Sequence, residues 1–285
     1  MLASVVALAT PVITLLLLAA VGLDVRVADL AAIRQRPLLV VSGLALPVLA
    51  MPLLAWGLTR LLNPGAAVAG GLLLLSICPT GGLSTTYSLL ARANAALAVT
   101  LAAVACVAAI VSIPLASAGL ELLTGDGGPV PAPVGTLVRQ VLLVFAPPIV
   151  LGMALRARWP VEAVRLLPVV QRAGFALLAV LMALVLADAA SRPAVPWRAA
   201  ITTMAAFVSL SFVIGIACAR LLAAPADDRF VLGAVFATRN VAAALAVALA
   251  LGRQAEFLWV AFVYLLVQIP LLSVAAAVRA RLSSA

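Results

Sequence analysis

The sequence contains no lysine and no histidine, and only 9% of its 285 residues are charged. A soluble domain carries about 25% charged residues, so a water-soluble fold is excluded. Without histidine, a histidine proton relay or a histidine metal site is impossible. The cysteines Cys78, Cys106 and Cys218 are isolated within apolar runs. We therefore expect buried thiols rather than a disulfide or zinc framework.

Hydrophobic residues make up 66% of the chain. This composition predicts an all-α polytopic membrane protein, with residues 1–285 forming a single transmembrane domain in the lipid bilayer. The net charge is +9, and all 18 of the positively charged residues are arginine. Most arginines lie at the ends of apolar runs, where membrane orientation uses them, so we expect no nucleic-acid partner.

Long apolar runs recur along the whole chain. A helix needs about 20 apolar residues to cross the hydrocarbon core. By that rule we expect about nine transmembrane helices, at residues 2–23, 38–59, 65–91, 95–122, 134–155, 164–188, 197–222, 229–252 and 256–278.

Arginine is distributed unequally between alternate connections. One side of the expected bundle holds twelve arginines and the other holds five, with Arg239 counted on neither side. The side richer in arginine is usually cytoplasmic. The sequence therefore predicts a multi-pass protein of the cell (inner, or cytoplasmic) membrane, with its N-terminus outside and its C-terminus in the cytoplasm.

Two parts of the chain, within residues 38–122 and 197–278, share a pattern. PGAAVAGGLLLLSICPTGG begins at Pro64, and PADDRFVLGAVFATRN begins at Pro225. Each unit has a polar interruption in its first span and an Ile-Pro-Leu near the end of its second. The two interrupted spans lie five segments apart and cross the membrane in opposite directions. This predicts inverted repeats of the kind found in secondary transporters; chance similarity between Ala/Leu-rich spans is the alternative.

The first interruption is ICPTGGLSTTYS, residues 77–88. Pro79 removes a backbone donor, and Gly81 and Gly82 are poor helix formers, so these three residues predict a helix break. The hydroxyls of Ser84, Thr85, Thr86 and Ser88 follow directly. Unwound backbone beside hydroxyl groups predicts a site for an ion or a polar substrate. The alternative is a kinked helix whose hydroxyls bond to their own carbonyls.

The second interruption is VFATRNVAAALAVAL, residues 235–249, with Thr238, Arg239 and Asn240 near its centre. An arginine at the middle of a span costs roughly 3 kcal/mol. All nine acidic residues lie at span ends or in loops, so we expect no carboxylate at the depth of Arg239. Three partners remain: the carbonyl ends of broken helices, an anionic substrate, or water in a cavity. A structural clamp without substrate contact is the alternative to a role in binding.

The segment CPTGGLSTTYSLLARANAALAVT, residues 78–100, resembles the motif of the bile acid:sodium symporter family. LPVLAMPLLAWGL before it and TRNVAAALAVAL after it are similar to the family's flanking segments, and the resemblance extends from about residue 10 to 275. It implies a core domain in which two discontinuous helices cross, and a panel domain that moves against it. The third and eighth expected segments would be the crossing helices.

The resemblance also implies positions for sodium ligands, and this sequence departs from them. Ser84 is kept, but Thr85 stands at an asparagine position, Ala98 and Ala102 replace hydroxyl residues, and Val235 replaces the only carboxylate. Pro47 aligns near one glutamine of a second ion site, Arg239 replaces the other, and Asn240 is kept. Since a guanidinium group supplies no oxygen ligand, sodium is disfavoured and no cofactor is expected. We predict that Arg239 is a tethered cation standing where sodium would bind.

Four functions follow from these observations. The first is transport of a small or amphipathic organic anion by alternating access without sodium, as a facilitator or exchanger; proton coupling is disfavoured because no histidine or buried carboxylate is expected. The second is a sodium symporter using Ser84, Thr85, Thr86 and carbonyl groups. The third is a non-transporting receptor or scaffold. The fourth, an intramembrane enzyme, lacks any acid, base or metal cluster. The sequence indicates neither the substrate nor an oligomeric state.

Overall fold

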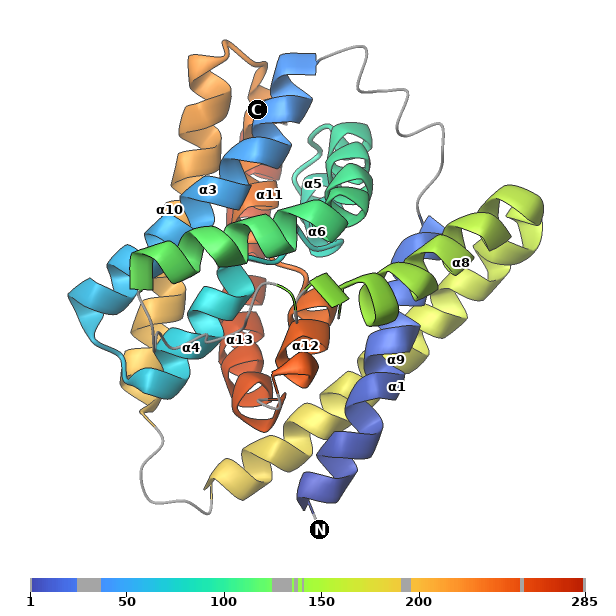
Figure 1. Cartoon of the computed structure of the whole chain (residues 1–285). Helices are drawn as coiled ribbons and strands as arrows, with labels where there is room; N and C mark the ends of the chain where they lie inside the picture. The colour runs from blue at the N-terminus through green and yellow to red at the C-terminus, as the bar shows by residue number, and fades with distance from the viewer. Residues whose placement is uncertain are drawn as a thin grey trace.

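The computed structural model describes residues 2–24, 37–124, 135, 138–139, 141–190, 196–251 and 254–283, and the regular elements in these ranges are helices (Figure 1). In chain order they are α1 (Leu2–Asp24), α3 (Pro37–Leu62), α4 (Ala66–Ser76), α5 (Leu83–Leu90), α6 (Ala95–Thr124), the π-helix η2 (Val141–Phe145), α8 (Ala146–Arg158), α9 (Pro160–Ala190), α10 (Trp197–Leu221), α11 (Ala226–Ala237), α12 (Val241–Ala250) and α13 (Gln254–Leu282). The predicted all-α membrane fold is confirmed.

Seven of the described helical segments are long and apolar enough to cross a membrane. The third expected span is divided into α4 and α5, with 11 and 8 residues, each too short to cross alone. The described part of the fifth includes the π-helix η2 and the 13-residue α8. The count of nine crossings therefore stays a prediction.

The helices form two groups. Helices α1, α8 and α9 pack against one another on one side of the molecule, and most of the other helices lie around α11 on the other side, with α12 between the two groups and packed against α1 (Figure 1). Glycines allow α1 and α8 to approach closely. A Cβ atom on Gly22 would lie 2.3 Å from the carbonyl oxygen of Ile149, and one on Gly152 would lie 2.7 Å from that of Ala19. Small residues commonly bring membrane helices together in this way.

The two parts predicted to be repeats contain the same order of elements. In each, a long helix (α3 or α10) precedes a broken helix (α4/α5 or α11/α12) and a second long helix with an internal proline (α6 or α13). The chain leaves the first long helix through a left-handed residue in both cases, at Asn63 (φ 43°) and Ala223 (φ 52°). A proline follows each of these residues closely. These shared features support inverted repeats, which remain a prediction.

The broken helix α11/α12 is enclosed by helices of both groups. Every residue from 230 to 248 is buried by protein. Arg239 is therefore not in contact with lipid, and whatever offsets the burial of its charge lies within the protein.

Candidate functional site

The two broken helices meet at their breaks. The first break separates α4 from α5 at residues 77–82, and the second separates α11 from α12 at residues 238–240. The amide of Asn240 donates to the carbonyl oxygen of Pro79 at 2.9 Å, and the amide of Gly81 donates to that of Thr238 at 3.4 Å. The hydroxyls of Thr80 and Thr238 lie 3.1 Å apart and share a hydrogen bond. Each break thus satisfies backbone groups of the other, which is how irregular backbone is tolerated inside a membrane protein.

Gly81 is required where the two breaks touch. A Cβ atom at this position would lie 2.9 Å from the carbonyl oxygen of Arg239 and 3.2 Å from its carbonyl carbon. The adjacent Gly82 has open space around its Cβ position and an ordinary helical conformation (φ −60°, ψ −18°). Of the two predicted helix-breaking glycines, close backbone approach therefore explains Gly81 alone.

Arg239 is only 4% exposed, and its guanidinium group binds carbonyl oxygens from both broken helices. One terminal nitrogen donates to Cys78 at 3.2 Å. The other donates to Val235 at 2.9 Å and to Phe236 at 2.8 Å. Within the described ranges, no carboxylate forms an ion pair with Arg239. The sequence left three possible partners for Arg239, and the one that contacts it in the structure is the set of carbonyl groups at the ends of the broken helices.

Tyr264 of α13 forms hydrogen bonds with two backbone groups of the second break. Its hydroxyl accepts a hydrogen bond from the amide of Arg239 at 2.6 Å and donates one to the carbonyl oxygen of Ala237 at 2.9 Å. The residue is fully buried. Our sequence reasoning missed it, although a tyrosine inside an apolar span signals a buried hydroxyl that needs a partner.

Asn240 has a structural role at the start of α12. Its side-chain oxygen accepts from the amide of Ala243 at 3.1 Å, so it caps the helix. Its side-chain nitrogen faces the sulfur of Cys106 at 3.9 Å. Cys78, Cys106 and Cys218 are all free and buried, as expected.

The hydroxyls predicted for the first break are only partly gathered at the crossing. Ser84 is buried and donates to the carbonyl oxygen of Gly81 at 2.9 Å, and Ser88 donates to that of Ser84 at 2.8 Å. Thr85 is half-buried and Thr86 is exposed. These bonds to nearby carbonyls match the alternative interpretation for Ser84 and Ser88, although the helix is truly broken rather than kinked.

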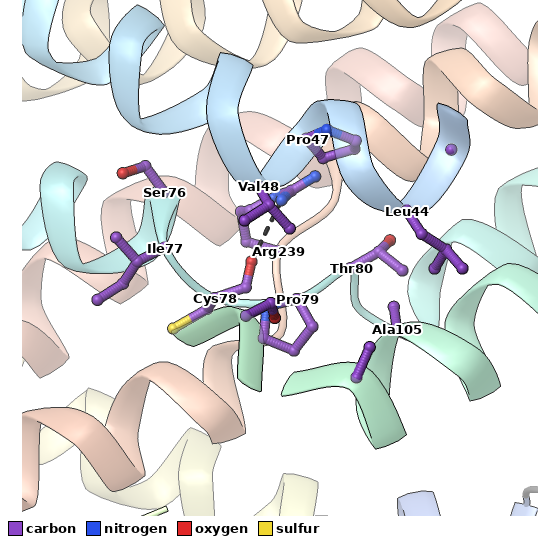
Figure 2. A pocket seen from close by; sticks show the side chains of 13 residues that line it. Leu44, Pro47, Val48, Ser76, Ile77, Cys78, Pro79, Thr80, Ala105 and Arg239 are labelled. Atoms are coloured by element: carbon purple, nitrogen blue, oxygen red, sulfur yellow. Dashed lines mark hydrogen bonds between the residues drawn. The ribbon is translucent and has the colours of Figure 1, made fainter. Parts of the chain in front are cut away.

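A small cavity lies beside the crossing, lined by α3, the first break, α6 and Arg239 (Figure 2). Figure 2 shows Pro47 and Val48 of α3 on one side of Arg239, with Cys78 and Pro79 on the other. The hydroxyl residues at its wall are Ser76, Thr80 and Ser112, none of which the sequence prediction included. Its volume of about 30 Å³ admits a water molecule or two but no organic anion.

One expectation about acidic residues is wrong. Asp228 lies near a span end, in the first turn of α11, but it is buried, with 1% exposure. Asn94 donates to its carboxylate at 2.8 Å and accepts from the amide of Leu97 at 3.1 Å. The carboxylate is buried because the connection between α5 and α6 folds over the start of α11. A buried carboxylate is therefore present, and the sequence-based argument against proton coupling no longer holds.

Comparison with known proteins identifies the family. The sequence model of the Sodium Bile acid symporter family matches residues 10–192, which is more than half of the chain. The chain belongs to this family. The match includes the first break but ends before the second, so the correspondence of Arg239 and Asn240 with family positions still rests on our reading of the sequence.

Several curated relatives of this symporter family member carry sodium in their names. A probable chloroplastic sodium/metabolite cotransporter of Arabidopsis thaliana is 31% identical over 128 residues, covering 44% of this chain and 30% of the relative. An uncharacterized sodium-dependent transporter of Bacillus subtilis is 30% identical over 156 residues, covering 54% and 47%. Sodium/bile acid cotransporter 5 of Rattus norvegicus is 28% identical over 152 residues, covering 53% and 35%. The matched region spans less than half the length of each relative.

Proposed function

We propose that this protein is a secondary transporter that moves an organic anion across the membrane by alternating access, without coupling to sodium. The observation that carries the proposal is the position of Arg239. A permanent cation lies at the crossing of two broken helices and binds carbonyl oxygens of Cys78, Val235 and Phe236. A charge buried within a membrane protein usually belongs to a substrate or ion pathway.

Sodium binding is opposed by both ligands and charge. Sodium needs oxygen ligands, and the carbonyl groups freed by the second break already accept hydrogen bonds from Arg239. Four of the positions that the family resemblance assigns to side-chain ligands hold Pro47, Ala98, Ala102 and Val235, which carry no side-chain oxygen. A unit charge about 4 Å from a sodium ion would repel it by about 4 kcal/mol at an effective dielectric constant of 20.

Anion transport requires the protein to open. The cavity beside Arg239 is too small for an organic anion, so substrate entry needs the helices around it to separate. The boundary between the group of α1, α8 and α9 and the rest of the bundle offers a place for such a movement, since transporters commonly rock one bundle against another. The buried Nε atom of Arg239 has no hydrogen-bond acceptor in the described part of the chain, so it is a free donor for an anion once the helices separate.

The test is uptake of small and amphipathic carboxylates and sulfonates into proteoliposomes, in sodium and in choline buffer. We expect wild-type uptake of at least one anion to be equal in the two buffers. Arg239→Gln should lower it about tenfold or more, because a hydrogen bond to a charged group contributes about 1.5–3 kcal/mol. Arg198→Gln, at an exposed arginine in the first turn of α10, is the matched control and should transport normally.

Two results would contradict the proposal: uptake that requires sodium, or unchanged uptake by Arg239→Gln. Thermal unfolding of each variant separates lost function from lost folding, and Arg239→Lys keeps a charge if the glutamine variant does not fold. Uptake is also measured with a protonophore, because the buried carboxylate of Asp228 is a candidate proton carrier.

A sodium:organic anion symporter is the second candidate. The names of the relatives favour it, since they include a sodium/metabolite cotransporter and a sodium-dependent transporter. In that case the ion would be held by Ser84, Thr85, Thr86 and main-chain carbonyls. Thermal stabilisation by sodium without any substrate, compared with choline, would favour the symporter.

A further inference from the structure

An open hollow of about 690 Å³ lies where α10 ends, α11 begins and α13 ends, far along these helices from Arg239. All three ends lie at the same end of the molecule as the C-terminus (Figure 1). Three arginines line the hollow: Arg220, Arg229 and Arg279. This hollow is called the groove below; a second open hollow, lined by α10 alone, adjoins it at Ile216 and Arg220.

The groove has a positive charge that the protein does not balance. Arg279 forms an ion pair with Asp227 and lies 5.8 Å from the ring of Phe230. Arg229 donates through Nε to the carbonyl oxygen of Ala224 at 2.6 Å, which anchors it at the groove. Within the described residues, neither Arg229 nor the exposed Arg220 forms an ion pair. Three arginines against Asp227 leave an excess of two positive charges.

The walls below these arginines are apolar. Phe212 and Ile216 precede Arg220 by two helical turns and one, so they share its face of α10. Val278 and Leu282 lie on α13 across the groove and are 52% and 75% exposed. Phe212 packs edge-on against Phe230 at 5.5 Å between ring centres, so two packed aromatic rings line the groove. The arginines at the helix ends match the charged headgroup of an anionic lipid, and the apolar walls of the groove match its acyl chain.

We propose that this groove binds an anionic phospholipid. The phosphate accepts hydrogen bonds from Arg220 and Arg229, and an acyl chain lies along Phe212, Ile216 and Val278. Basic pockets between membrane helices recognise anionic headgroups in this way. The site is separate from the crossing of the broken helices, so it does not depend on the transported substrate.

The experiment measures lipid binding by native mass spectrometry of the full chain released from detergent. Phosphatidylglycerol, phosphatidylcholine and inorganic phosphate are the probes. We expect phosphatidylglycerol to bind more tightly than phosphatidylcholine, and inorganic phosphate not to compete. Arg220→Gln should weaken phosphatidylglycerol binding about fivefold, and the double variant with Arg229→Gln about 25-fold, because one arginine near an anionic surface contributes about 1 kcal/mol.

Arg198→Gln is the matched control, since Arg198 is an exposed arginine at the opposite end of the same helix. It should leave binding unchanged, and Arg220→Lys, which keeps the charge, should bind within about twofold of wild type. Equal loss in Arg198→Gln would mean non-specific surface charge and would overturn the proposal. Competition by inorganic phosphate would mean an anion site without lipid selectivity. A dimer that disappears with Arg220→Gln would place a second copy of the chain in the groove instead.

Discussion

Arg239 is held by main-chain oxygen atoms rather than by carboxylates. The ends of broken helices expose carbonyl groups that carry partial negative charge, and three of them surround the guanidinium group. An arginine near the middle of an apolar span is therefore compatible with stable folding here, because the break that exposes the carbonyls also provides its partners.

At the same residue scale, Tyr264→Phe tests how the second break is held. The substitution leaves the amide of Arg239 and the carbonyl of Ala237 without their hydroxyl partner. An unsatisfied buried group costs about 1–3 kcal/mol, so we expect a lower melting temperature. Tyr87→Phe is the matched control, since it removes a single bond from Gln268 at 3.2 Å and should cause a smaller decrease. An equal decrease would mean that Tyr264 does not hold the break.

At the element scale, the crossing depends on how closely two breaks can approach. We expect Gly81→Ala to disturb it, since its Cβ would meet the backbone of Arg239, which cannot rotate away as a side chain can. Gly82→Ala should fold as well as wild type, or be about 0.4–1 kcal/mol more stable, because alanine fits its helical conformation. Thermal unfolding and uptake of the two variants distinguish them. Similar behaviour of both would mean that the breaks lie farther apart than the structure places them.

At the scale of the whole molecule, the number of crossings determines where the ends of the chain lie. The predicted nine crossings and the arginine distribution lead us to expect the C-terminus in the cytoplasm, at the same side as the connection after α5. Alkaline phosphatase fused after Ser283 or after Arg92 should therefore be inactive, and a fusion after Asn63 should be active. Fluorescence of a C-terminal green fluorescent protein provides the complementary signal. An active phosphatase after Ser283 would reverse the proposed orientation.

Much of the architecture could be predicted from periodicity and composition. The expected spans agree with the observed helices to within a few residues for α1, α3, α6 and α10, because long apolar runs have few alternatives in a bilayer. The break at Pro79 and Gly81 follows from local backbone chemistry. The fifth expected span, at 134–155, begins among residues outside the described ranges, and its described part contains a π-helix that no local pattern predicted.

The sequence by itself determined that this is an all-α membrane protein, that two of its spans are interrupted, and that a charge is buried in the second of them. Only the tertiary structure decided what each interruption contacts. Thr80 pairs with Thr238, Tyr264 bridges Ala237 and Arg239, and Asp228 is covered by Asn94. These partners are at least 25 residues apart, and two of the four pairs are more than 130 apart. Local sequence governs hydrogen bonds within a helix, but once a helix breaks, its free groups are satisfied by whichever element packs against them.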